Sequence, residues 1–316
     1  MAEKKPKTFG AGAGIVWRRQ RVLWGIFLIT VFFSHFGARR PAERVGGALN
    51  HSLTATPRLV HGFDLSAIAE LAEQPEAPLE VFNRSLMAFP IVFAVFILFA
   101  TGGILVSYYR DETLTTGEFF GAAGRHFWRF FRLLIYFAIA TIPIMILIAI
   151  ASAIYDHLDE VSTSPLTSVH FFEAAAVVIL FLAMTLRLWF DMAQVISVAE
   201  EETHMHKALR MAAGLVWRNF GSLFWLYFRV SFLGCFGFGL GLYWWMIHLR
   251  PESTTSAFIL GQFMILFWIA TRLWQRASEA AWYREYQAAE FESAPAFSPV
   301  PVPVMAGPTT ATPAVN

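Results

Sequence analysis

The sequence predicts an all-α protein, a polytopic transmembrane bundle of six spans with two amphipathic helices at the cytoplasmic interface. The 316 residues are 56% apolar and 15% charged, and their mean hydropathy is +0.51. Soluble domains are about 45–50% apolar and about 25% charged, so this composition disfavours a simple soluble enzyme. In addition, six segments are apolar for long enough to cross a bilayer, and basic residues concentrate in alternate loops.

Each predicted span holds roughly 20 mostly apolar residues, the length needed to cross about 30 Å of hydrocarbon. The spans are Val22–Gly37, Ala88–Tyr108, Leu133–Ile154, Phe171–Trp189, Leu223–Ile247 and Ser256–Leu273. The first is the shortest, and a signal peptide cleaved after a small residue such as Ala38 is the alternative interpretation. A long basic segment precedes it and bulky Phe36 lies at the would-be cleavage site, so we expect a retained helix.

The distribution of Lys and Arg predicts the orientation. Residues 1–21 and the loop 109–132 are basic, whereas the loop 155–170 contains no Lys or Arg. Cytoplasmic loops carry the excess of basic residues, so we expect an inner (plasma) membrane protein with both termini in the cytoplasm. The loop 38–87 contains five Arg and disagrees with this pattern, although a loop of about 50 residues can be translocated regardless of its charge.

The chain accordingly divides into three parts. They are a basic cytoplasmic amino terminus (1–21), a six-helix membrane domain (22–292) with an extracytoplasmic cap loop (38–87), and a disordered Pro/Ala-rich cytoplasmic tail (293–316). Within the cap loop we expect short helices at Pro41–Ser52 and Asp64–Glu73, the second beginning at a potential N-cap aspartate.

Two cytoplasmic segments, Glu118–Leu134 and His204–Phe220, have the periodicity of amphipathic helices. The basic residues of each segment share one face, opposite an apolar face. They are Arg125, Arg129 and Arg132 in the first segment and Lys207, Arg210 and Arg218 in the second. We expect these residues to contact anionic lipid headgroups while the apolar faces meet acyl chains. The alternative is that both segments are connectors packed on the bundle.

A threefold pattern runs through the membrane domain. Odd-numbered spans are entered through Trp17-Arg18, Trp128-Arg129 and Trp217-Arg218, and two even-numbered spans end in Arg187-Leu188-Trp189 and Arg272-Leu273-Trp274. This pattern suggests three helical hairpins, because internal repeats are common in membrane folds. The alternative is that Trp and Arg gather at membrane interfaces for general reasons.

Charged residues within spans are candidates for function. They are Arg187, Asp191, Arg229 and Arg272. Asp191 and Arg229 lie at similar depth, so we expect a salt bridge between them, with snorkelling of the arginines as the alternative. Gly237 and Gly241 form a GxxxG motif, which predicts close helix packing.

No motif for catalysis is present. The sequence has no HExxH, Walker or GxSxG motif, and a single cysteine, Cys235, excludes an intrachain disulfide and a Cys-based metal site. We therefore assign no catalytic, cofactor-binding or metal-ligating residue and expect no cofactor, which favours a protein that is not an enzyme. The net charge of +1 argues against a nucleic acid partner.

Two stretches carry a resemblance. They are Leu114-Thr-Thr-Gly-Glu118 with the following Phe127-Trp-Arg-Phe-Phe-Arg-Leu, and Ile196-Ser-Val-Ala-Glu200 with Ala208-Leu-Arg-Met-Ala and Trp217-Arg-Asn-Phe. In these stretches the chain resembles uncharacterised bacterial six-helix integral membrane proteins. It is distantly similar to the membrane domain of glycerophosphodiester phosphodiesterases, whose hydrolase part has no counterpart here. The resemblance implies only a multi-pass protein of the bacterial inner membrane.

These observations favour a membrane scaffold or accessory protein of unknown biochemical activity, because such a protein requires no more than spans, interfacial helices and a proline-rich tail. A transporter or lipid-handling membrane protein is the alternative, and it would require polar groups within the membrane. The expected partners are the lipid bilayer, its anionic headgroups and other membrane proteins.

Overall fold

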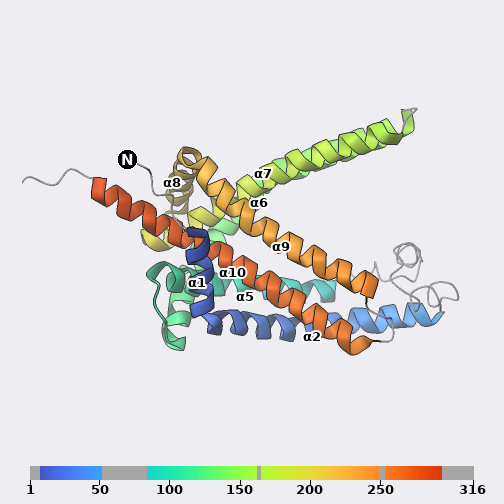
Figure 1. The fold of residues 1–316 in the computed structure, drawn as a ribbon, viewed down its shortest axis with the longest axis horizontal. Coiled ribbons are helices and arrows are strands. Elements are labelled where there is room, and N and C mark those ends of the chain that lie inside the picture. Colours follow the sequence, from blue (N-terminus) through green and yellow to red (C-terminus); the bar gives the residue numbers. More distant parts are fainter. Residues whose placement is uncertain (1–7, 52–83, 162–164, 249–252, 294–316) are drawn as a thin grey trace, which may run out of the picture.

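The computed structural model describes residues 8–51, 84–161, 165–248 and 253–293, and every element in these ranges is a helix (Figure 1). The helices are α1 (Thr8–Arg18), α2 (Gln20–His51), α5 (Arg84–Arg110), α6 (Thr116–Val161), α7 (Pro165–Ala199), α8 (Met205–Arg218), α9 (Phe220–His248) and α10 (Thr254–Ser293). All of them except α1 and α8 contain a stretch long and apolar enough to cross a membrane, which confirms the predicted number of six.

Several helices are longer than the apolar segments that predicted them. The helix expected at Pro41–Ser52 is not separate, because α2 continues without interruption to His51. The segment Glu118–Leu134 is the first part of α6 and runs directly into the span. Helix α10 extends beyond Leu273 as far as Ser293. The expected helix Asp64–Glu73 and the tail from residue 294 lie outside the described residues.

Two tight turns, between α5 and α6 and between α7 and α8, are built in the same way. Asp111 and Glu201 have positive φ angles of 53° and 49°, which end the preceding helices. The Ser107 hydroxyl donates to the carbonyl oxygen of Glu112 at 3.1 Å, and the Ser197 hydroxyl donates to the equivalent carbonyl of Glu202 at 3.4 Å. We call the end of the bundle that holds both turns the turn end.

Three long helices form the centre of the molecule. Helices α5, α7 and α10 pack against one another, and each also packs against one amphipathic segment at the turn end: α6 on α5, α8 on α7, and α1 on α10. Small residues allow the close approaches. A Cβ atom added at Gly102 would lie 3.1 Å from the Cα atom of Ala123, and one at Gly12 would lie 2.8 Å from the backbone nitrogen of Ser278.

Each of the helices α5, α7 and α10 has an aromatic residue that contacts the amphipathic segment packed on it. The indole nitrogen of Trp189 donates to the carbonyl of Leu209 in α8 at 2.8 Å, and that of Trp274 donates to the carbonyl of Phe9 in α1 at the same distance. In the remaining pair of helices Phe99 stacks on Phe120, with 6.1 Å between ring centroids. Two of the three helix pairs thus share an indole-to-carbonyl hydrogen bond, and the third has a contact between two phenyl rings instead.

The apolar face of α8 lies against protein. Six apolar residues of this face are buried, and all of them except Ala208 join the core formed with α7: Met205, Ala208, Leu209, Ala212, Leu215 and Val216. The expectation that this face meets acyl chains is therefore wrong, because α7 occupies the place assigned to lipid. In α6 the result is mixed, since Phe130 is buried whereas 48% of Phe120 is exposed.

The far halves of α6 and α7 stand apart from the rest of the bundle. Figure 1 shows these two helices running together, away from α9 and α10. Near the turn end α7 belongs to the centre of the molecule, and Phe130 of α6 and Leu188 and Met192 of α7 are fully buried there. The far halves of both helices carry exposed apolar side chains such as Ile146 and Val177, as expected for surfaces that face lipid.

The predicted GxxxG packing is confirmed on α9. Gly237 faces the ring of Phe267, and a Cβ atom added at Gly241 would lie 2.8 Å from Cγ of Met264. Both neighbours belong to α10, so the two glycines set the separation of α9 and α10.

Candidate functional site: an axial cavity

A cavity of about 670 Å³ lies between the three central helices and their neighbours α2 and α9. We call it the axial cavity. It is lined by Ile26, Thr30, Ser34, Phe93, Ile97, Thr101, Ile104, Arg187, Asp191, Phe238, Ile265, Trp268, Ile269, Arg272, Leu273, Gln275 and Arg276. Each central helix contributes residues one turn apart, and in the threefold pattern the pair Arg187 and Asp191 of α7 corresponds to Arg272 and Arg276 of α10.

The charged lining of the axial cavity is predominantly cationic, with three arginines and one aspartate. The Nε atom of Arg187 lies 3.6 Å from Oδ2 of Asp191, and the guanidinium of Arg272 lies 4.6 Å from the ring centroid of Trp268. The Nη1 atom of Arg276 is buried and has no hydrogen-bond partner among the described residues. A buried donor without a partner is costly, so Arg276 has capacity for an acceptor.

A second layer of polar residues follows one turn further along α10. Glu279 is 2% exposed, and its Oε1 atom accepts a hydrogen bond from Nε2 of Gln275 at 3.3 Å. The other carboxyl oxygen, Oε2, has no hydrogen-bond partner within the described parts of the chain. A buried carboxyl group therefore lies next to the cationic end of the cavity, one turn closer to the turn end.

The far part of the axial cavity is apolar. Its walls include Phe93, Phe238 and Ile265. Two of the hydroxyl groups in the lining are already satisfied, because Thr30 donates to the carbonyl of Ile26 and Thr101 donates to that of Ile97, both at 2.7 Å. The cavity thus combines one cationic end with apolar walls.

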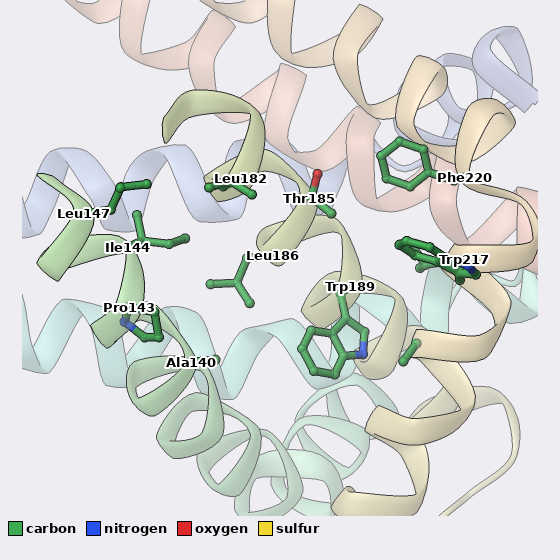
Figure 2. Close-up of a pocket in the computed structure, with 12 residues that line it drawn as sticks. Ala140, Pro143, Ile144, Leu147, Leu182, Thr185, Leu186, Trp189, Trp217 and Phe220 are labelled. Carbon is green, nitrogen blue, oxygen red and sulfur yellow. The ribbon is translucent and has the colours of Figure 1, made fainter. Parts of the chain in front are cut away.

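A separate groove of about 530 Å³ lies between α6, α7 and the junction of α8 with α9. Figure 2 shows Leu186 and Trp189 of α7 between Pro143 and Ile144 on one side and Trp217 and Phe220 on the other. No ionisable side chain lines this groove. It offers apolar surface but no group that would select a ligand.

The four intramembrane charges predicted from the sequence separate into two locations. Arg187, Asp191 and Arg272 line the axial cavity, whereas the guanidinium of Arg229 lies over the rings of Phe9 and Trp225, at 5.6 and 5.4 Å. The predicted salt bridge between Asp191 and Arg229 is wrong. Asp191 instead pairs with Arg187, one turn earlier on its own helix.

The six basic residues predicted at the interface all lie near the turn end. Arg125, Arg132, Arg210 and Arg218 are exposed, and Arg129 is half-buried. Lys207 is exposed and already forms an ion pair, because its Nζ atom lies 2.6 Å from a carboxylate oxygen of Glu202. That hydrogen bond, followed by one from the backbone N–H of His204, lowers the pKa of Glu202 to about 2.

Asp111 connects three parts of the turn end. Its carboxylate lies 3.1 Å from Arg18, 3.4 Å from Arg19 and 4.0 Å from Arg284, residues of α1, the α1–α2 junction and α10. Partial burial opposes ionisation of this carboxyl, but the hydrogen bonds and charges of the arginines outweigh it and lower its pKa below the ordinary value.

Arg276, Gln275 and Glu279 were missed as site residues, because the predicted last span ended at Leu273. A signal was present: Arg276 follows Arg272 by one turn, as Asp191 follows Arg187.

No family model, curated protein or solved structure matches this chain. The geometry of the axial cavity is therefore the basis for a functional assignment.

Proposed function

We propose that this chain is a multi-pass protein of the bacterial inner membrane, with both termini in the cytoplasm, that binds an anionic ligand in the axial cavity. This places it in the transporter or lipid-handling class. The single observation that carries the proposal is the excess of three arginines over one aspartate in the cavity lining, with Arg276 Nη1 lacking a partner.

The physical argument concerns the cost of buried charge. An uncompensated cation within a membrane bundle is expensive, and such residues pair with one another or line ligand pathways. Asp191 compensates Arg187. The guanidinium of Arg272 lies over the ring of Trp268, and the buried carboxyl group of Glu279, one turn further along α10, offsets part of the charge of Arg276. The Nη1 atom of Arg276 still has no partner among the described residues. A carboxylate or phosphate group is the natural partner of that donor, because its oxygens match the planar fork of arginine.

A scaffold or accessory role remains the second candidate. The exposed apolar far halves of α6 and α7 favour it, since they offer area to another membrane protein. A scaffold role does not explain why arginines line the axial cavity, so we rank it lower.

The orientation proposal rests on the turn end. Exposed Arg125, Arg132, Arg210 and Arg218 gather there, in agreement with a cytoplasmic location of basic residues. We propose that these four, with Arg129 and Lys207, contact anionic headgroups from the side of the helices opposite their buried apolar faces. Trp17, Trp128 and Trp217 are 76%, 65% and 83% exposed, as expected for side chains at the headgroup level.

The anion proposal is tested on the purified full-length protein in a neutral detergent. Anionic probes, inorganic phosphate and phosphatidylglycerol, are added and the melting temperature is measured. A ligand at about 100 times its Kd stabilises the folded state by about 2.7 kcal/mol, a readily measured shift. The double variant Arg272→Gln/Arg276→Gln should lose the shift.

Arg229→Gln is the matched control, because it removes an arginine of α9 that lies outside the cavity. It should leave the shift unchanged. If no anionic probe raises the melting temperature of the folded wild-type protein, or if the double variant keeps the full shift, the proposed function is wrong.

A further inference from the structure

We infer that the ligand of the axial cavity is an anionic phospholipid, with its phosphate held by Arg272 and Arg276 and an acyl chain against the apolar far part of the cavity. This inference rests on the proposed function, and it adds the chemical class of the ligand. It is distinguished below from binding of a small anion.

The depth of the arginines agrees with a lipid phosphate. The apolar part of α10 starts at Thr255, and Arg272 follows it by a helical rise of roughly 25 Å. Because the hydrocarbon core is about 30 Å thick, Arg272 and Arg276 lie near the headgroups of the leaflet at the turn end. A lipid can thus enter from that leaflet without moving its phosphate far from its ordinary depth.

The size and polarity of the cavity disfavour a small anion. One water molecule has a share of about 30 Å³ in the liquid, so a cavity of about 670 Å³ is far larger than a phosphate ion. A hydrated phosphate would leave water against Phe93, Phe238 and Ile265, where the nearby Thr30 and Thr101 hydroxyl groups already donate to their own helices. An acyl chain would remove that apolar surface from water.

Binding of the phosphate and binding of the acyl chain can be tested by separate substitutions at the two ends of the cavity. Arg276→Gln removes the donor that lacks a partner and should weaken every phosphate-bearing ligand. Ile265→Trp fills the apolar part and should weaken only ligands with long chains. Phe263→Trp is the matched control, because Phe263 lies on the same helix, is 68% exposed and is not part of the lining.

The experiment uses the full chain, delipidated in neutral detergent, and compares four probes by the concentration that gives half of the maximal rise in melting temperature. The probes are inorganic phosphate, dihexanoyl-phosphatidylglycerol, dioleoyl-phosphatidylglycerol and dioleoyl-phosphatidylcholine. We expect dioleoyl-phosphatidylglycerol to act at a concentration at least about tenfold lower than the short-chain lipid, and phosphatidylcholine to be weaker than its anionic counterpart. Ile265→Trp should abolish the long-chain advantage, and Phe263→Trp should keep it.

Three results would overturn the inference. If inorganic phosphate protects as well as the long-chain lipid, the ligand is a small anion, and the proposed function stands without the lipid. If the long-chain lipid protects but neither Arg276→Gln nor Ile265→Trp changes its effect, the lipid binds elsewhere on the surface. If none of the anionic probes protects, the proposed function falls as well.

Discussion

At the scale of single residues, Asp111 shows how one side chain determines the arrangement of a whole end of the bundle. Its positive φ angle ends α5, and its carboxylate then meets arginines from α1, the α1–α2 junction and α10. The turn that redirects the chain is thus also the point where the other turn-end elements are joined.

Asp111→Asn tests this role, because asparagine also tolerates a positive φ angle and only the charge is lost. The variant should melt roughly 1–4 °C below the wild type at pH 7. Since the pKa of Asp111 is lowered in the folded protein, its stabilisation is present above the unfolded value of about 3.9 and is lost as the pH falls through the folded value. The difference in melting temperature should therefore shrink below about pH 4, and a constant difference would contradict the assignment.

A double-mutant cycle tests the ion pair in the axial cavity. Arg187→Gln and Asp191→Asn should be coupled, because their side chains are 3.6 Å apart, and the coupling should be about 0.6 kcal/mol. Arg229→Gln with Asp191→Asn should instead be additive in unfolding measurements, because Arg229 stacks on Phe9 and Trp225. Coupling of Asp191 to Arg229 would restore the pairing expected from sequence and contradict the structure.

At the scale of helices, close backbone contact explains how α1 packs on α10. Gly12 meets the backbone of Ser278, whereas Gly10 has no neighbour within 4 Å of an added Cβ atom. Ile15 and Val16 then bury their side chains in the same cluster as Leu273 and Ala277 of α10.

Gly12→Ala should therefore separate α1 from α10 and destabilise the protein by about 1–3 kcal/mol, because the backbone of Ser278 cannot move aside cheaply. Gly10→Ala adds the same methyl group to the same helix without a clash and is the control. Limited proteolysis near residue 18, compared between the two variants, provides the measurement. Equal resistance of both variants to proteolysis would contradict this prediction, because it would show that the added methyl group at residue 12 does not separate α1 from α10.

The helices were predictable where hydrophobicity alone determines them, and less so elsewhere. The six spans follow from long apolar segments, and the buried face of α8 follows from its periodicity. The periodicity does not indicate what the apolar face of α8 packs against, because acyl chains and α7 both provide an apolar surface. The extension of α10 to Ser293 was missed since its charged surface resembles a connector, while its stability comes from packing on α1 and α5.

At the scale of the whole molecule, topology is the first property to verify. Reporter fusions at positions 60, 160 and 252 should report the outside, and fusions at positions 120, 205 and 300 should report the cytoplasm. The reason is that the basic turn end is the end proposed to face the cytoplasm. A cytoplasmic signal at position 60 would show that the five arginines keep the cap loop in the cytoplasm, and would contradict the predicted topology.

The axial cavity could be predicted only in part, because it depends on three helices that meet. Arg187, Asp191 and Arg272 are recognisable in the sequence as charged residues within spans. No local pattern, however, indicates that α7 and α10 lie side by side with these residues in one cavity. The two Arg-Leu-Trp motifs are the available indication in the sequence, and they become informative only once the indole contacts of Trp189 with α8 and of Trp274 with α1 are known.

The threefold arrangement also has a consequence for the order of synthesis. The hydrogen bond from Trp274 to Phe9 joins residues 265 positions apart, so α1 emerges early and waits for a partner made much later. Until α10 is made, the apolar surface of Ile15 and Val16 lacks the part of its cluster formed by Leu273, Ala277, Ala280 and Ala281. Synthesis of α10 therefore completes the packing of the first helix, and a chain arrested before Trp274 would leave α1 without its main partner and open to proteolysis.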